Sequence, residues 1–529
     1  MKTKINYLTL LFAATLGGCY NYSSNSLFHD LWDTDVVATQ DAIYAILPSS
    51  GMLMKLSANG DFSEVDLQGA SPTRLVASPD GSKLLVFTDY LECKIDDENI
   101  VYISDCPDND ITTTSELAVL SAGVVEKVYD IPSHLNTVSF SNDGSIVVAY
   151  LEYQSGSSIQ VDGFADLGEV AFINLVDESQ GSASVGFSPS QILFAPNNQA
   201  VVMSRSQIVV VDLASFQPVL EAPLTLDADQ EVNPSEAELA YDPATGSVTL
   251  LLTVQNSSDL FMLDFETESW NIGDLGAIPT DIGVDASSSQ SVFVFSNSSK
   301  AVVLDHSDLS TLNSASIEDI DLEEVMNSVI VSDGFSLLFN DSSNVVHDVY
   351  RLDMESRELV EYVVANPLYE MTLSQSGKYA VGLMKPESSY GSGIDAYQDA
   401  RYGLVVLDME SDDVVNLVAE TQPIGLEIVE GADGDFALVL LDGKDTLLQV
   451  NLANPSQSVE VDLPAAPIAI ATQPITIDGE QEKFIISHDV EIGMVSILDP
   501  KTLEIQTITG FGLAGSLSQP AFFNREEGE

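Results

Sequence analysis

The sequence predicts an all-β protein, a β-propeller of four-stranded blades, and two recurring features predict it. The first is an apolar strand that runs into an aspartate and a polar turn, as in residues 349–356 (VYRLDMES), 404–411 (LVVLDMES) and 495–502 (VSILDPKT). The second is a tight turn, often Asp-Gly, placed earlier in each unit. One such unit cannot bury both faces of its small sheet, and stacking units around an axis solves that problem.

The number of repeat units can be counted from the polar residue that ends one strand in each unit. From Ser57 to Asp499 the ten positions span 442 residues in nine intervals, or about 49 residues per unit, which is in the range of blade-type repeats. Ten units exceed the usual ~4–8 blades. Two smaller rings and irregular decorations are therefore alternatives, but a single ring is favoured because no linker breaks the middle of the chain. The ten positions are Ser57, Ser121, Asn174, Asp212, Asp264, Asp305, Asp353, Asp408, Asn451 and Asp499.

The tight turns predict where the strands before and after them lie in the sequence. Asp-Gly and Asn residues tolerate the positive φ angles of hairpin turns, and apolar strands follow them. The strand-ending Asp is expected to accept backbone N–H bonds in the turn after it, because a residue repeated in every unit serves architecture rather than catalysis. No long amphipathic helix is expected; the best candidate, residues 317–330, is short and acidic. The strands expected after the turns are 83–87, 145–150, 291–295, 379–383 and 436–441.

The N-terminus has the pattern of a targeting segment. Lys2 and Lys4 precede a short apolar run, residues 5–16, that is too short for a comfortable membrane span. The run ends in Leu-Gly-Gly-Cys, which resembles the lipobox of bacterial lipoproteins and implies that Cys19 is lipidated. Tyr20 follows instead of Asp, which by the sorting rule of enteric-type lipoproteins implies the outer membrane. An ordinary secretory signal with an incidental Cys is the alternative.

These signals divide the chain into four parts. Residues 1–18 are the predicted signal peptide and 19–35 the lipidated Cys with a polar tether. The predicted propeller covers 36–518, and 519–529 form an acidic tail. The first unit lacks a clear inner strand before Val36, so residues 513–518 are expected to pair back into it and close the ring.

The charge balance limits the classes of partner that the protein can bind. The chain has 82 acidic and 18 basic residues, a formal net charge of -64. Such a surface excludes nucleic acid. Adaptation to a salty medium, solubility and cation binding all fit this composition. With 45% hydrophobic residues the chain is nevertheless not a disordered acidic polymer.

Three cysteines are present, and lipidation would use one of them. Export places Cys93 and Cys106 in an oxidising compartment, where a disulfide is expected rather than a metal site. The same segment carries Asp105, Asp108 and Asp110, which could ligate calcium, although no acidic cluster in the chain matches a full EF-hand loop. No other cofactor is expected.

Two insertions interrupt the repeat and are the expected recognition surfaces, because binding often lies on long loops of a rigid scaffold. The first is residues 91–116, and the second is residues 385–402. Decoration without a partner is the alternative. The side chains expected to recognise a partner in the second insertion are Tyr390, Asp395, Tyr397, Asp399, Arg401 and Tyr402.

The phrases S-P-D-G-x-x-L-x-V (residues 78–86) and V-x-x-L-D-x-x-S (residues 349–356) resemble those of bacterial propellers with YVTN-type, WD40-like and lactonase-like repeats. The resemblance covers roughly residues 36–515 and implies the fold more than an activity. The chain lacks the repeated Trp-Asp pairs of true WD40 repeats. Lactonase-like relatives raise the alternative of an enzyme, with Arg74 and Arg205 near inner-strand positions facing a central channel; surface pairing with acids is the competing interpretation.

Taken together, the sequence predicts a lipid-anchored propeller of the cell envelope that works as a protein- or ligand-binding scaffold. The predicted location is the outer membrane, with the side left open, and the predicted partner is an envelope protein or surface ligand. No catalytic residue is predicted: the five histidines are scattered, and no Gly-x-Ser-x-Gly turn or phosphate-binding loop occurs. A lactonase- or quinoprotein-type enzyme and a calcium-dependent adhesin are the alternatives.

Overall fold

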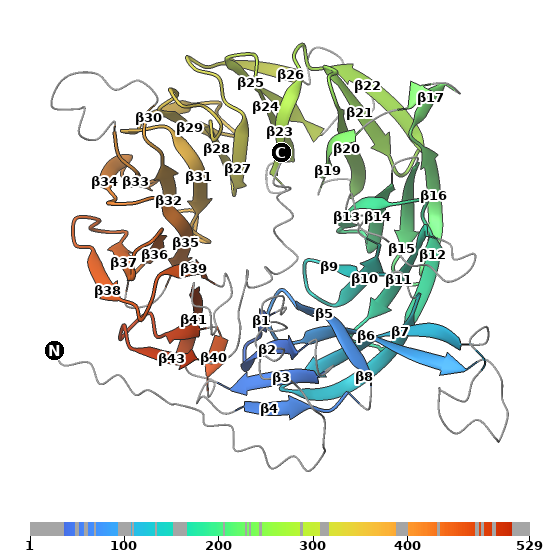
Figure 1. Ribbon diagram of the computed structural model, residues 1–529. Helices are drawn as coiled ribbons and strands as arrows, with labels where there is room; N and C mark the ends of the chain where they lie inside the picture. Colours follow the sequence, from blue (N-terminus) through green and yellow to red (C-terminus); the bar gives the residue numbers. More distant parts are fainter. Residues whose placement is uncertain are drawn as a thin grey trace.

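Ten small antiparallel sheets follow one another around a ring in chain order (Figure 1). Each sheet is one blade, with its first strand nearest the axis and its last strand on the perimeter. The computed structural model describes residues 36–509 except for short gaps. The gaps are 48–51, 58–61, 68–69, 94–106, 108–110, 133–134, 152–166, 205–206, 228–229, 232–233, 243–245, 286–288, 307–316, 388–399, 431–433, 471–474, 478–480 and 489–493.

The strands of the first five blades are as follows. Blade 1 has β1 (Val36–Ala38), β2 (Ala42–Leu47), β3 (Met52–Ser57) and β4 (Phe62–Val65). Blade 2 has β5 (Ser71–Ala77), β6 (Leu84–Cys93), β7 (Ile111–Ser121) and β8 (Val124–Ile131). Blade 3 has β9 (Thr137–Phe140), β10 (Ile146–Tyr150), β11 (Glu169–Asn174) and β12 (Gln180–Ser184). Blade 4 has β13 (Pro189–Ala195), β14 (Gln199–Ser204), β15 (Gln207–Asp212) and β16 (Gln217–Pro223). Blade 5 has β19 (Pro234–Asp242), β20 (Ser247–Val254), β21 (Asp259–Asp264) and β22 (Ser269–Asp274).

The other five blades complete the ring. Blade 6 has β23 (Pro279–Asp285), β24 (Gln290–Phe295), β25 (Lys300–Asp305) and β26 (Ile317–Asp321). Blade 7 has β27 (Ser328–Ser332), β28 (Phe335–Phe339), β29 (Asp348–Asp353) and β30 (Leu359–Val363). Blade 8 has β31 (Leu368–Leu373), β32 (Tyr379–Met384), β33 (Gly403–Asp408) and β34 (Asp413–Val418). Blade 9 has β35 (Pro423–Val429), β36 (Phe436–Leu441), β37 (Thr446–Asn451) and β38 (Val459–Asp462). Blade 10 has β39 (Pro467–Ile470), β41 (Gln481–His488), β42 (Met494–Leu498) and β43 (Ile505–Thr509).

Two short additions decorate this plan. β17 (Thr225–Asp227) and β18 (Gln230–Glu231) form a hairpin between blades 4 and 5, and β40 (Ile475–Ile477) pairs with β41. The segment 317–330, the best helix candidate, contains β26 and the start of β27 instead. Its alternating apolar and acidic residues suit a half-exposed edge strand better than a helix.

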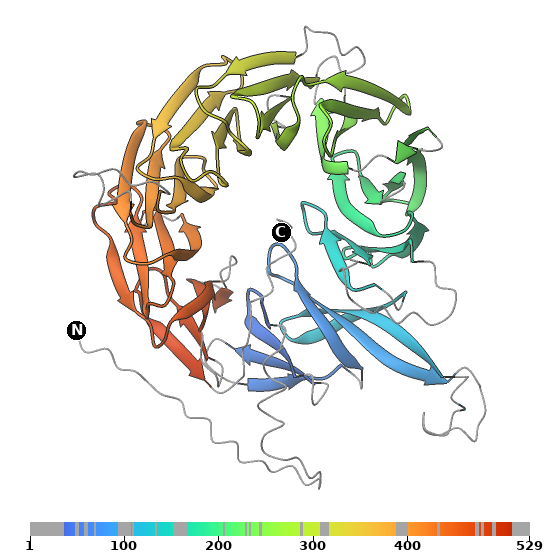
Figure 2. The same ribbon diagram turned by 45° about the horizontal axis from the view of Figure 1, so that its top comes forward.

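The single large ring predicted from the repeat is confirmed, with one blade for each of the ten counted units. Blade 1 is four-stranded from its own residues, because β1 already occupies the innermost position and pairs Val37 with Tyr44 of β2. The expected return of residues 513–518 into this blade lies outside the described residues. Blade 10 lies beside blade 1 in both views of the ring (Figures 1 and 2).

The core lies between neighbouring blades rather than inside any one of them. In β11, Val170 and Phe172 pack toward blade 4, while Ala171 and Ile173 pack toward blade 2. Strands buried on both faces explain the continuous apolar runs in the second and third strand of each unit. Each blade therefore depends on its two neighbours for burial.

The strand-ending residues lie where they were predicted, and six of them accept the predicted pair of N–H bonds. Nine of the ten end the third strand of their blade, and Asp499 comes directly after β42. The Asp353 Oδ1 atom accepts the backbone N–H groups of Glu355 (3.1 Å) and Ser356 (2.7 Å). The same pair of acceptances recurs at Asn174, Asp212, Asp264, Asp408 and Asp499.

Replacing Asp353 with alanine tests this architectural role. The substitution removes the acceptor for both N–H groups and for the Ser356 hydroxyl (2.8 Å), so we expect a loss of about 1 kcal/mol in the free energy of unfolding. Asp353→Asn is the matched control, because asparagine occupies the equivalent position at Asn174 and should retain most of the stability. Urea unfolding of both variants measures the difference; equal losses would contradict the turn role.

Candidate functional site

The innermost strands line the inner rim of the ring, and seven of them start in the same irregular way. In each of the seven the pairing with the second strand skips one residue near the strand start, which is a β-bulge. Six of these strands have a proline just before the skipped residue. Proline suits this place because an innermost strand is an edge strand, where the missing N–H costs no ladder bond. The six are Pro72, Pro189, Pro234, Pro279, Pro423 and Pro467.

In blades 2, 4, 5 and 6 this start is one repeated tripeptide, Pro followed by Ser or Thr and then a polar residue. The four occurrences are Pro-Thr-Arg (72–74), Pro-Ser-Gln (189–191), Pro-Ser-Glu (234–236) and Pro-Thr-Asp (279–281). The hydroxyl of the skipped residue bonds across to the second strand: Thr73 and Thr280 each donate to a carbonyl oxygen there at 3.2 Å. The bulge is thereby held, and the third residue is turned toward the neighbouring blade.

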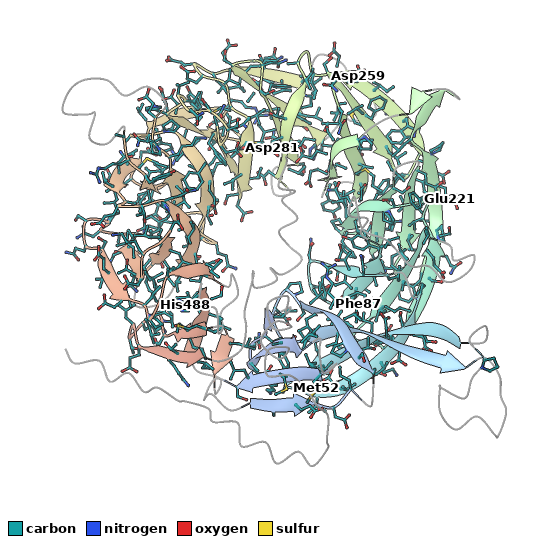
Figure 3. All side chains as sticks on the ribbon, viewed as in Figure 1. Met52, Phe87, Glu221, Asp259, Asp281 and His488 are labelled. Atoms are coloured by element: carbon teal, nitrogen blue, oxygen red, sulfur yellow. The ribbon has the colours of Figure 1, made fainter. Side chains whose placement is uncertain are left out.

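The third residues, Arg74, Gln191, Glu236 and Asp281, each contact the next blade, and we call them the latch residues. Arg74 Nη1 donates to the Asn136 carbonyl oxygen (2.7 Å) at the start of blade 3. Gln191 Nε2 donates to the Ala237 carbonyl oxygen (3.0 Å) in blade 5. The Glu236 carboxyl is hydrogen-bonded to the Asp281 carboxyl in blade 6, and Asp281 Oδ2 accepts the Val329 N–H (2.8 Å) from blade 7. Figure 3 shows Asp281 at the inner edge of the ring.

The carboxyl groups of this rim have strongly perturbed protonation. Burial, followed by the charge and hydrogen bond of Asp281, raises the pKa of Glu236 to about 9. Burial and then Asp281 also raise the pKa of Glu238, on the same strand, to about 7. On the other side of the ring, burial and then Glu370 in blade 8 raise the pKa of Glu427 in blade 9 to about 8. Perturbed carboxyl groups of this kind mark candidate functional sites but also occur in structural networks.

Two serine–histidine contacts also occur in the described part of the chain. The Ser291 hydroxyl lies 2.5 Å from His306 Nε2, and the Ser496 hydroxyl lies 2.7 Å from His488 Nε2. All four residues are buried, and burial lowers the pKa of His306 to about 4. Neither hydroxyl is accessible to a substrate, so these pairs belong to the core.

Most basic side chains of the described ranges form ion pairs with carboxylates. Eight lysine and arginine residues of the described ranges form ion pairs, and some of these pairs bridge neighbouring blades. Lys127 of blade 2 lies 2.9 Å from Glu178 of blade 3, and Arg357 of blade 7 lies 3.0 Å from Glu318 of blade 6. The remaining surface is dominated by carboxylates, so the ring presents net negative charge to any partner.

A second feature projects from the ring. The β6–β7 hairpin of blade 2 is paired from Leu84 with Leu120 to Cys93 with Ile111, ten pairs in all, whereas the corresponding β14–β15 hairpin of blade 4 has five. Its far end extends beyond the perimeter of the ring (Figure 2). This hairpin carries the first of the two predicted recognition insertions away from the core.

The structure places few of the sequence-predicted site residues. Arg401 and Tyr402 lie just before β33; the Arg401 carbonyl oxygen accepts a bond from Asn366 Nδ2 (2.7 Å), and Tyr402 packs against the core between blades 8 and 9. Cys93 ends β6. Arg74 lies on an innermost strand as expected, but its guanidinium bonds to blade 3. The predicted residues outside the described ranges are Cys19, Cys106, Asp105, Asp108, Asp110, Arg205, Tyr390, Asp395, Tyr397 and Asp399.

Of the latch residues, sequence reasoning named Arg74 and missed Gln191, Glu236 and Asp281, and it did not predict their contacts with the next blade. The signal that could have found them is the Pro-Ser/Thr-polar tripeptide, which recurs six to eight residues before the end of the first strand in blades 4, 5 and 6 and five residues before it in blade 2. Among the described residues, no group of three or more His, Cys, Asp or Glu side chains is arranged to hold a metal ion. The same residues contain no helix long and apolar enough to cross a membrane.

The fold and rim define the class of protein as a β-propeller with ten blades. No family model matches the chain, and no curated protein matches it. Among solved structures, dihydro-heme d1 dehydrogenase NirN in complex with DHE is similar with a TM-score of 0.40 and 12% identity, over 76% of this chain and 72% of that one. A eukaryotic initiation factor gives 0.41 and 13%, over 72% and 87%. Hydrazine synthase of Kuenenia stuttgartiensis gives 0.32 and 12%, over 61% and 95%.

Proposed function

We propose that this propeller is a protein-binding scaffold of the cell envelope, held to the outer membrane through a lipid on Cys19. The observation that carries the binding role is the β6–β7 hairpin, which extends a paired, polar ribbon beyond a rigid ring. Loops and hairpins that project from a rigid scaffold are common recognition elements. The lipid anchor rests on the lipobox-like N-terminus alone.

The charge of the chain indicates the chemistry of the partner. With a formal net charge of -64, the scaffold repels acidic proteins and attracts basic surfaces over a Debye length. A partner with a basic patch would therefore bind faster at low salt than at high salt. The hairpin supplies the specific contact, and the acidic ring supplies the attraction.

A shortened hairpin tests the proposal. Replacing residues 89–115 with the two-residue turn Asn-Gly connects Thr88 to Glu116, which face each other in the ladder, through that turn and keeps the core residues Leu85 and Leu117. We expect this variant, tagged and with Cys19 retained, to keep its melting temperature and to lose its stoichiometric partner in cross-linking from intact envelopes. The matched control replaces residues 388–399, in the second insertion, by a Gly-Ser segment of equal length.

The outcomes separate the claims. A partner lost with the 388–399 control but retained with the short hairpin would move recognition to the second insertion. The absence of any partner for the unmodified protein would overturn the scaffold role. Cys19→Ser is expected to release the protein from the membrane fraction, and a variant that stays membrane-bound would refute the lipid anchor.

A further inference from the structure

The contact between blades 5 and 6 differs chemically from the latch contacts around it. Arg74 and Gln191 reach the next blade with a guanidinium and an amide, neither of which titrates near neutral pH. Glu236 makes the equivalent reach with a carboxyl group and meets a second carboxyl group, that of Asp281. Two carboxyl groups can hydrogen-bond only while at least one of them carries a proton.

The surroundings assign that proton to Glu236. Asp281 uses Oδ2 to accept the Val329 N–H (2.8 Å) and Oδ1 to accept the Ile282 N–H (3.0 Å). Both Asp281 oxygens therefore act as acceptors, which leaves Glu236 as the donor. The loss of its proton would place two negative charges in contact, in a partly buried position where water screens them poorly.

We propose that the Glu236–Asp281 pair is a proton-dependent latch, which holds blade 5 to blade 6 at the inner rim while Glu236 is protonated and opens when that proton is lost. Through Asp281 the same latch reaches Val329, so one proton links three consecutive innermost strands, β19, β23 and β27. The inner rim would thus be tighter in acid and looser in alkali at this sector of the ring. Blades 2 and 4, with their non-titrating latch residues, would not respond.

Among the described residues, most of the groups that act on Glu236 favour its protonated form. From its own strand β19 the charge that acts on it is Glu238, and from β23 it is Asp281, with the Ile282 N–H as the favourable contact. Blade 4 contributes the neutral Gln191, which bonds to the Ala237 carbonyl oxygen. From β27 the contact is the Val329 N–H, made through Asp281. The two charged neighbours named here, Glu238 and Asp281, are acidic, and they reinforce burial in favouring the protonated form.

The direction of the pH effect follows from linkage. The pKa of Glu236 is raised from 4.5 to about 9 in the folded protein. Between these values the folded state keeps a proton that the unfolded state has released, so stability falls as pH rises through this window. The contribution is complete below about pH 4.5 and is lost once the pH passes about 9.

The decisive variant is Glu236→Gln, because it gives blade 5 the amide that blade 4 already has at Gln191. Melting temperatures are measured from about pH 5 to about pH 9.5, a range that brackets the raised pKa. We expect the unmodified protein to lose more melting temperature over this range than Glu236→Gln, and the variant to be the more stable one at the alkaline end. Glu221→Gln, on the exposed outer strand of blade 4 (Figure 3), is the matched control and should follow the unmodified protein.

A second variant and a local measurement keep the test independent of global stability. Asp281→Asn retains an oxygen for Val329 and supplies an N–H group to an ionised Glu236, so it too should flatten the pH profile. Hydrogen exchange of the Val329 amide, corrected for its intrinsic pH dependence, should accelerate by up to about tenfold per pH unit as the pH rises from about 4.5 toward about 9 in the unmodified protein and level off above that pKa. Glu236→Gln should show no such rise. Equal pH profiles for all three proteins, or Val329 exchange that follows global unfolding alone, would overturn the latch.

Discussion

Replacing Phe172 with alanine is expected to lower the free energy of unfolding by about 3–5 kcal/mol, which is the usual cost of removing a buried aromatic ring. Phe172 is 0% exposed between blades 3 and 4, where its ring stacks on Phe216 with centroids 6.0 Å apart. The surrounding strands cannot collapse into the space, because both neighbouring blades are tied to the next ones around the ring. Guanidinium unfolding followed by circular dichroism measures the loss.

Phe187 provides the matched control for this prediction. It is the same residue type, 15 positions further along the chain, but it is 47% exposed. Phe187→Ala is therefore expected to change the free energy of unfolding by no more than about 0.5 kcal/mol. Similar losses for the two variants would show that the junction between blades 3 and 4 is not the packed core described above.

Replacing Gly403 with alanine is expected to cost about 3 kcal/mol, at the upper end for overpacking, because the clash is with backbone. Gly403 starts β33 and pairs with Val418 of β34. A Cβ atom there would overlap the Leu417 carbonyl oxygen and lie 2.9 Å from Met384 Cε. The methionine can move aside, but the carbonyl belongs to the strand ladder and cannot.

Gly425 is the matched control for this second prediction. It also lies in a strand, β35, but a Cβ atom would meet its nearest neighbour, Ile470 Cγ2, at an ordinary 3.4 Å. We expect Gly425→Ala to be tolerated within about 1 kcal/mol. A Gly403→Ala protein as stable as Gly425→Ala in the same denaturant titration would contradict the steric argument at β33.

The perimeter explains part of the acidic composition. Every blade ends in an edge strand, and an exposed edge can pair with another chain unless charge or shape prevents it. In blade 6 this edge is β26, with the sequence IEDID, where Glu318, Asp319 and Asp321 are exposed. Like charges on such edges oppose pairing between copies of the ring. The negative charge therefore favours solubility, in addition to attracting the basic partner proposed above.

The sequence by itself determined the features that depend on neighbouring residues. The strand-ending Asp353 bonds to residues no more than three positions away, and so does the tight turn at residues 78–81. Both features therefore appear in the sequence as recurring short motifs. Counting these strand-ending residues gave ten units, and the structure has ten blades. The β6–β7 insertion was also visible as a break in the spacing of these residues.

Only the tertiary structure decided how the units meet. The sequence left open one ring, two rings or irregular units, because closure depends on the small rotation between blades that no single repeat encodes. It also left the latch unseen: Glu236 and Asp281 are 45 residues apart, and Asp281 and Val329 are 48 apart. From sequence alone, a carboxyl group in a polar tripeptide is expected to be exposed to solvent. Only the packing of a second blade shows that another carboxyl group lies against it. Burial and that neighbour, both products of the ring, turn Glu236 from an ordinary acid into a proton donor.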